Sequence, residues 1–277
     1  MTSAWVVLSG GQDSTTCLYW AKNRFDAVHA ITFDYGQSHI REIDAAETVA
    51  VKAGVNSWRV VEIPSILKGR SPLIDAGENL EQYEDFESMD ETIGDRVELT
   101  FVPMRNALFL TIAANRAVCA DVYDIVTGVC QSDNANYPDC RDSFIRHQTS
   151  AINYALGLEH KKQRVTIHTP LMNLTKAQSI DLACKLDGCY KALEDTHTSY
   201  DGQYPPTGKD HATVLRAHGF EEAGLPDPLI MRAAGDGLME IPLTSNYSEE
   251  AIARFRGSRT HSLFSIDSQR GFDDRAD

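Results

Sequence analysis

The chain has 277 residues, of which 42% are hydrophobic and 24% charged, a composition typical of a globular protein with a full core. Its formal net charge of −14 argues against a general nucleic-acid binder, because such proteins need a basic stripe of lysine and arginine. No apolar run approaches the length of a membrane span, and we expect no signal peptide. The six scattered cysteines contain no C-x-x-C pair, so we expect buried free thiols in a cytoplasmic protein.

A phosphate-binding loop is predicted at residues 9–14. The apolar run over residues 6–8 predicts a buried strand, and the Ser-Gly-Gly-Gln-Asp-Ser sequence after it turns tightly into a helix expected from Ser14. A strand, a glycine turn and a helix N-terminus direct backbone N–H groups and the positive end of the helix dipole at one point. An ordinary strand–turn–helix corner is the alternative. Asp13 would repel a phosphate unless a cation lay between them, so we expect Mg²⁺ there.

Alternating strands and helices predict a parallel sheet. Strands are expected at residues 26–35 and 58–63, separated by a helix over residues 38–53. This spacing implies right-handed crossovers, and ligands of such sheets bind outside the carboxyl ends of the strands. At that edge, Asp34 and Tyr35 either frame an adenosine or simply close a turn.

The remaining chain begins with residues 64–99, which are acidic and have little periodicity. They predict an insertion, a lid or a solvated loop, with the solvated loop as the default. The elements expected after them are a helix over 106–120, a strand over 122–128, a helix over 139–157 capped by Asp139, a strand over 165–169, a helix over 176–186 capped by Thr175, and a docking helix over 248–255. After Gly257 the sequence is polar with mixed charge, and we expect disorder.

Three polar features stand at the ends of predicted elements. Arg105, at a strand-to-helix junction, is either a surface cation or a forked clamp for phosphate or carboxylate. The loop over residues 128–142 carries more donors and acceptors than a turn requires, which favours binding of a heterocycle. Lys176 lies in the first turn of a predicted helix, where the dipole disfavours a cation, so it is either a plain exposed lysine or the partner of a ligand phosphate.

Several segments together resemble one family, the 7-cyano-7-deazaguanine synthases of the queuosine pathway, within the PP-loop ATP pyrophosphatase superfamily. The segments are residues 9–16, 33–37, 101–106, 128–142 and 170–172, together with Lys176. The resemblance implies a doubly wound parallel α/β sheet, adenine nucleotide α-hydrolase-like, in residues 1–219. A small, partly disordered extension is expected at residues 220–277.

This resemblance also implies an activity. Members of the family use two ATP and ammonia to turn 7-carboxy-7-deazaguanine into the nitrile through an amide, releasing AMP and pyrophosphate. We therefore expect an ATP-dependent carbon–nitrogen ligase that uses Mg²⁺, forms a homodimer and has no direct nucleic-acid or membrane partner. Two alternatives stay open: a relative that stops at the amide or conjugates the acid to another amine, and a non-catalytic module that binds ATP and deazaguanine.

The same resemblance assigns site residues. Asp13, Arg105 and Lys176 are expected to be catalytic, with Asp13 carrying the magnesium. The residues expected to bind ATP are Leu8, Ser9, Gly10, Gly11, Gln12, Asp13, Ser14, Thr15, Thr16, Cys17, Leu18, Asp34 and Tyr35. The residues expected to bind the deazaguanine are Arg105, Asn106, Gln131, Asp133, Tyr137, Asp139 and Arg141.

The chain departs from the family in residues 195–219, where members hold a structural zinc with four cysteines. The residues at the corresponding positions are Ser199, Thr207, Asp210 and Thr213. Three hydroxyls and one carboxylate do not supply thiolate ligands, so we expect no structural zinc. His197, His211 and His218, with Asp210, could form a replacement site, but their spacing favours ordinary surface histidines.

Overall fold

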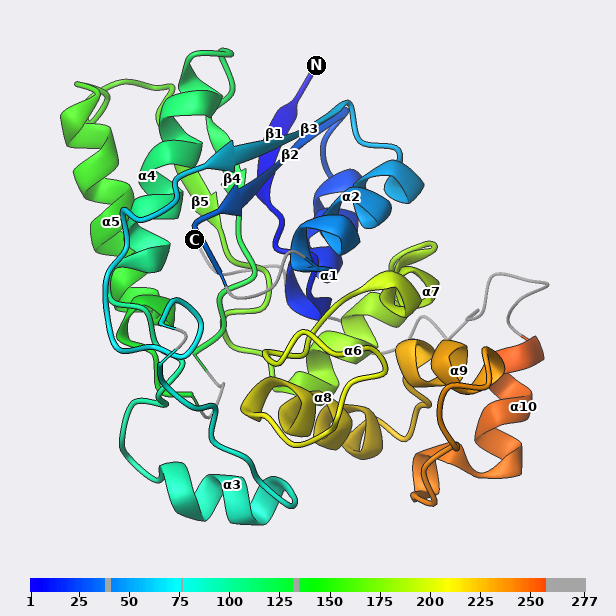
Figure 1. The fold of residues 1–277 in the computed structure, drawn as a ribbon. Helices are drawn as coiled ribbons and strands as arrows, with labels where there is room; N and C mark the ends of the chain where they lie inside the picture. Colours follow the sequence, from blue (N-terminus) through cyan, green and yellow to red (C-terminus); the bar gives the residue numbers. More distant parts are fainter. Residues whose placement is uncertain (38–40, 76, 132–134, 258–277) are drawn as a thin grey trace.

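Five parallel strands form the sheet on which the chain is built (Figure 1). The computed structural model describes residues 1–277 except 38–40, 76, 132–134 and 258–277. The strands are β1 (Ser3–Val7), β2 (Ala27–Asp34), β3 (Ser57–Glu62), β4 (Asp124–Val126) and β5 (Thr166–His168). Their order is β3-β2-β1-β4-β5, and every neighbouring pair is parallel. The predicted parallel α/β sheet is confirmed.

Helices cover both faces of this sheet (Figure 1). Helices α1 (Gln12–Lys22) and α2 (Arg41–Ala53) enclose one core with the sheet, in which Val6, Leu18 and Val49 are fully buried. Helices α4 (Arg105–Val118) and α5 (Asp142–Ala155) contribute to the core on the opposite face. Because apolar side chains alternate along β1 between the two faces, both cores use the same strand.

The strand order reverses between β1 and β4. The chain runs outward from β1 through β2 to β3, and then returns to place β4 on the other side of β1. Loops that leave two such strands diverge in opposite directions, which opens a crevice at the carboxyl ends. The glycine-rich loop after β1 and the polar loop after β4 therefore face one another at this position.

The other helices lie mainly beyond the carboxyl edge of the sheet (Figure 1). They are α3 (Phe86–Ile93), α6 (Lys176–Lys185), α7 (Cys189–Ala192), α8 (His211–Glu222), α9 (Pro228–Gly235) and α10 (Glu249–Gly257), with short 3₁₀ turns η1 (Pro138–Cys140), η2 (Leu193–Asp195) and η3 (Ser245–Tyr247). The Thr175 cap predicted for α6 is confirmed, since its hydroxyl accepts a hydrogen bond from the Gln178 amide at 3.2 Å. The helix expected over residues 248–255 is also present, as α10.

The prediction of a solvated loop over residues 64–99 is wrong for residues 86–93, because these residues form α3. Asp85 caps this helix and forms a capping box with Ser88. Met89 and Ile93 lie one turn apart on its inner face and are buried against α8. The acidic residues occupy the outer face, so this acidic stretch contains an amphipathic helix.

The helix cap expected at Asp139 is also wrong. Arg141 is the N-cap residue of α5, while Asp139 lies in the preceding turn η1. The Asp139 carboxylate instead accepts hydrogen bonds from the backbone amide and the side-chain amide of Asn106, both at 3.1 Å. It therefore stabilises the start of α4, where the first amides lack partners within the helix.

The C-terminal extension is fastened to the main body by polar contacts. The buried Arg216 guanidinium of α8 pairs with Asp227 at 2.6 and 2.8 Å. The Tyr247 hydroxyl accepts a hydrogen bond from the Asp227 amide at 3.3 Å, and the Tyr190 hydroxyl donates to the Pro226 carbonyl at 2.5 Å. The disorder expected after Gly257 falls outside the described residues. Within the described ones, no helix is both long and apolar enough to cross a membrane.

Candidate active site

The loop after β1 is held in a tight turn by its own residues. Gly10 has a φ of +86°, and a Cβ at this position would lie 2.3 Å from the carbonyl oxygen of Glu42, so only glycine fits. The Ser14 hydroxyl accepts a hydrogen bond from the Ser9 amide at 3.2 Å and donates to the Gly11 carbonyl at 3.1 Å. The loop therefore enters α1 with its first amides turned toward the crevice, which is the arrangement of an anion site.

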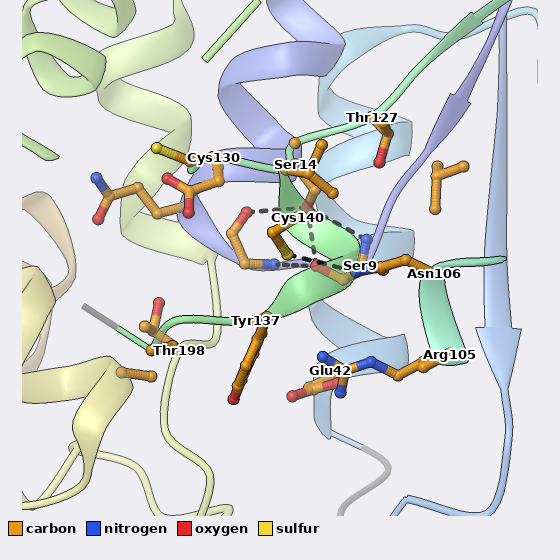
Figure 2. A pocket seen from close by; sticks show the side chains of 18 of the residues that line it. Ser9, Ser14, Glu42, Arg105, Asn106, Thr127, Cys130, Tyr137, Cys140 and Thr198 are labelled. Atoms are coloured by element: carbon orange, nitrogen blue, oxygen red, sulfur yellow. Dashed lines mark hydrogen bonds between the residues drawn. The ribbon is translucent and has the colours of Figure 1, made fainter. Parts of the chain in front are cut away.

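A cavity of about 270 Å³ lies in front of this loop (Figure 2). Its walls come from the phosphate loop, the strand ends of β2 and β4, the first residues of α4, α6 and α8, and the segment after η2. Gln12 at the start of α1 is 4% exposed, and neither polar atom of its side-chain amide has a hydrogen-bond partner among the described residues. An unsatisfied buried amide on a cavity wall is costly, and a bound ligand or water would relieve that cost.

Lys176 and Asp13 meet at the edge of the loop. The Lys176 ammonium lies 2.9 Å from the Asp13 carboxylate, and both side chains are largely buried. Gly219 of α8 allows this placement, because a Cβ there would lie 2.4 Å from Lys176 Cγ. The close approach of α6 and α8 at Gly219 thus directs the lysine at the loop.

Arg105 stands across the cavity from the phosphate loop, at the first position of α4. Its guanidinium lies 6.0 Å from the centre of the Tyr35 ring, and one of its nitrogens donates to the Tyr35 hydroxyl at 3.5 Å. Both side chains line the cavity, so a forked cation faces the site. Of the two alternatives that the sequence left open for Arg105, the plain surface cation is therefore excluded.

The residues expected to contact ATP fall into two groups. Those that line the cavity are Leu8, Ser9, Gly11, Gln12, Asp13, Ser14 and Tyr35. Those that lie elsewhere are Gly10, Thr15, Thr16, Cys17, Leu18 and Asp34. Thr15 to Leu18 are buried inside α1, where they support the loop from behind, and Gly10 faces α2. Burial raises the pKa of the Cys17 thiol, which therefore stays protonated.

Some of the residues expected to bind the deazaguanine line the main cavity, and others do not. Arg105, Asn106 and Tyr137 line the main cavity, whereas Gln131 and Arg141 line an adjoining hollow that shares the Tyr137 wall. Asp133 falls outside the described residues. Asp139 is buried beneath the wall and holds Asn106 in place.

Several lining residues were not expected from the sequence. They include Glu42 at the start of α2, Thr127 directly after β4, His197, Thr198 and Tyr200 in the segment after η2, and His211 and Arg216 on α8. Their positions along the chain carry no local motif, because they reach the cavity only through the packing of helices on the sheet edge.

Three of these unexpected residues, Glu42, Tyr200 and His211, have pKa values shifted from their usual ranges, and burial raises the pKa of the Tyr200 hydroxyl. Burial raises the pKa of the Glu42 carboxyl to about 7, although the nearby Arg105 cation acts in the opposite direction. Burial, together with the Lys176 cation, lowers the pKa of His211 to about 4. The cavity therefore holds a carboxyl poised near neutrality and an imidazole that stays uncharged.

The positions that correspond to zinc cysteines hold a hydrogen-bonded cluster. The Ser199 hydroxyl donates to Asp201 and, at 3.1 Å, to Asp210. The Thr207 hydroxyl donates to Asp201 at 2.9 Å, and the Thr213 hydroxyl donates to the Asp210 carbonyl at 3.0 Å. Among the residues that the structure describes, no three His, Cys, Asp or Glu side chains gather as metal ligands. These donors do not fit a zinc site, because neutral hydroxyls are poor zinc ligands.

The surface position expected for the nearby histidines is wrong for two of them. His197 is 8% exposed and His211 is 4% exposed. A ring nitrogen of His197 lies 2.9 Å from the Ser199 carbonyl, and His211 lines the cavity. His218 is half-buried and stacks on Phe86 of α3 at a ring separation of 3.7 Å. His211 and His218 thus lie on α8, whereas His197 lies in the segment after η2 and is held by the backbone of Ser199.

The fold and the loop define an α/β protein with the geometry of an anion site at the switch point of its sheet. Residues 3–224 match the family model described as "Queuosine biosynthesis protein QueC". The chain is 47% identical to the 7-cyano-7-deazaguanine synthase of Laribacter hongkongensis, over 84% of this chain and 96% of that protein. It is 43% identical to the synthase of the same name from Gloeobacter violaceus, over 83% of this chain and 96% of that protein. The chain belongs to this family, and the resemblance of its motifs is confirmed.

Among solved structures, the chain is also similar to an NMN synthetase from Francisella tularensis. The match has 15% sequence identity and a TM-score of 0.40, over 97% of this chain and 90% of that one. A likeness this weak carries no argument about function.

Proposed function

We propose that this protein converts 7-carboxy-7-deazaguanine to 7-cyano-7-deazaguanine with ATP and ammonia, releasing AMP and pyrophosphate. The observation that carries the proposal is one cavity that holds the phosphate loop, Arg105 and Lys176 together, in a chain whose relatives are named 7-cyano-7-deazaguanine synthases. A protein that only bound nucleotide would not need two cations, Arg105 and Lys176, on the lining of one cavity.

The chemistry explains why these groups are needed. A carboxylate is a poor electrophile, so its oxygen first attacks the α-phosphorus of ATP, and pyrophosphate leaves. Ammonia then displaces AMP to form the amide. The amide oxygen is adenylated in turn, and loss of AMP with the remaining N–H protons gives the nitrile. Negative charge builds on the phosphates in each adenylation, so preorganised donors and cations lower the barrier.

Each group of the cavity has a role in this proposal. The amides of the loop between Ser9 and Ser14 bind pyrophosphate oxygens. Lys176 neutralises the departing pyrophosphate, and its burial beside the loop supports that role. Arg105 orients the substrate carboxylate against the α-phosphate, because its planar fork suits a carboxylate.

Magnesium fits the Asp13 side of the loop. Mg²⁺ is commonly held in proteins by one or two carboxylates together with substrate phosphates and water. Asp13 supplies a carboxylate at the mouth of the anion site, where a phosphate alone would be repelled. When bound, the ion offsets the charge of the triphosphate, and Asp13 is its protein ligand in this proposal.

The deazaguanine is assigned to the far wall of the cavity. Tyr137 is buried there and its hydroxyl hydrogen-bonds Thr100, so its ring is held as a stacking surface. Asn106 stands beside it, fixed by Asp139. Gln131 and Arg141 line the adjoining hollow, which supports a role for them at the heterocycle edge in this proposal.

The proposal also includes a cellular compartment, the cytoplasm, and an oligomeric state. All six cysteines are free thiols, which suits a reducing cytoplasm. We further propose a homodimer without a structural zinc, and no direct contact with nucleic acid, in keeping with the net charge of −14.

The test is a mass-spectrometric product assay with purified protein, 7-carboxy-7-deazaguanine, Mg-ATP and ammonium, in which AMP is counted alongside the product. The nitrile with two AMP per product supports the proposal. The amide with one AMP would replace it with an amide-forming enzyme. A folded protein that releases no AMP would be a binding module, and the proposal would be wrong.

A further inference from the structure

Glu42 is a carboxyl group that faces the cavity but has no task in the reaction described above. It lies in the first turn of α2, and its side chain points toward the Arg105 guanidinium across the cavity (Figure 2). Among the described residues, none donates a hydrogen bond to its carboxyl oxygens. A partly buried carboxyl is normally hydrogen-bonded, so its position on a cavity wall indicates a ligand or a reacting group.

The cavity offers few other proton acceptors. Of the described residues that line it, Asp13 and Glu42 are the carboxylates. Asp13 is paired with Lys176 at the phosphate loop. Two imidazoles also line it: a ring nitrogen of His197 is hydrogen-bonded to the Ser199 carbonyl at 2.9 Å, and His211 is a weak base, since burial and the Lys176 cation lower its pKa to about 4. Glu42, with a pKa raised to about 7 by burial, is much better matched to proton transfer near neutral pH.

The surroundings of Glu42 favour a cation. The charged and titratable side chains that interact with it are Arg105 on α4, Tyr35 after β2 and Tyr200 in the segment after η2. Burial raises the pKa of both tyrosines, which are therefore neutral. Once a substrate carboxylate or phosphate engages Arg105, Glu42 is left without its cation, and a small cation can take that place.

We propose that Glu42 binds the incoming ammonium ion and accepts a proton from it, so that free ammonia can attack the adenylated acid. This inference rests on the proposed function, because it concerns the nitrogen donor of that reaction. Ammonia is mostly ammonium at neutral pH, and ammonium has no lone pair with which to attack. A carboxylate near the reacting carbon solves both problems, since it attracts the cation and removes its proton.

The step balances as follows. Glu42 takes one proton from ammonium, and the resulting ammonia forms a bond from nitrogen to the acyl carbon. The bond from that carbon to the AMP oxygen breaks, and its electron pair stays on AMP. The second proton passes from nitrogen to water as the amide forms. Glu42 then returns its own proton to water.

The test compares Glu42→Gln with Asp44→Asn, a neighbouring exposed carboxylate on the same helix. Two reactions are measured for each variant. The first is exchange of labelled pyrophosphate into ATP with 7-carboxy-7-deazaguanine and no ammonium, which reports adenylation alone. The second is amide formation at neutral pH, with ammonium or with hydroxylamine, a nucleophile that is largely unprotonated at that pH.

We expect the loss of rate to be large with ammonium, which must give up a proton, and small with hydroxylamine. Glu42→Gln should keep pyrophosphate exchange, lose about 10²-fold in rate with ammonium, and lose far less with hydroxylamine. Its deficit with ammonium should shrink as pH rises, because more free ammonia is then present. Asp44→Asn should behave as the unaltered protein in every assay.

Two outcomes would overturn the inference. Equal losses with both nucleophiles would assign Glu42 to substrate binding, and a loss of pyrophosphate exchange would assign it to the ATP site. If the proposed function itself is wrong, the unaltered protein will show no pyrophosphate exchange with 7-carboxy-7-deazaguanine, which distinguishes this case from the two outcomes above. A Glu42→Asp variant, which keeps the carboxylate, should recover part of the ammonium rate.

Discussion

The contact between Gly219 and Lys176 allows a sharp test of how the site is positioned. Replacement of Gly219 by alanine would place a methyl group 2.4 Å from Lys176 Cγ and 2.8 Å from its Cβ. These atoms lie close to the backbone of α6, so the lysine cannot avoid the methyl group by rotating its far end. Either α6 and α8 separate or the Lys176 side chain leaves its place beside Asp13.

Two effects of opposite sign decide the stability of this variant. Alanine in a helix is favoured over glycine by about 1 kcal/mol. Overpacking a close contact costs about 1–3 kcal/mol, so we expect a net loss of about 1 kcal/mol. For a chain of this size, that corresponds to a fall in Tm of about 2–4 °C. The functional effect should be larger, because the displaced ammonium no longer faces the phosphate loop.

The assay pairs thermal unfolding with the KM for ATP. Gly235→Ala is the matched control, because Gly235 also lies in a helix and no atom stands within 4 Å of its added Cβ. We expect Gly235→Ala to leave both quantities unchanged or to raise Tm slightly. We expect Gly219→Ala to lower Tm and to raise KM. A Gly219→Ala protein with a higher Tm and an unchanged KM would refute the argument from close packing.

Three further predictions concern the loop, the extension and the zinc positions. Asp13→Asn should abolish most pyrophosphate release, and normal release would exclude a magnesium role. Arg216→Met leaves the buried Asp227 charge unpaired and should cost about 3–5 kcal/mol in urea unfolding; a loss below about 1 kcal/mol would contradict this. EDTA should leave Tm unchanged, whereas Asp201→Ala, which removes acceptors for Ser199 and Thr207, should lower it. One zinc per chain by elemental analysis would contradict the prediction for EDTA.

Local features of the sequence were sufficient to predict the framework. The strand before the phosphate loop is a short apolar run, and the loop is a glycine turn that leads into a helix. The Thr175 cap and the helix at residues 249–257 follow equally from neighbouring residues. Such features depend on propensity and periodicity within a few residues, which a single sequence contains in full.

The tertiary structure alone decided which side chains share the cavity. Glu42 lies in an amphipathic helix that the sequence predicts, yet its direction toward Arg105 depends on how α2 and α4 flank the sheet edge. Gly219 is an ordinary helical glycine until α6 lies against it. Asp139 has the pattern of a cap for α5, but it stabilises α4 because the strand order brings the two helices together. These relations arise from contacts between distant residues, and no local pattern contains them.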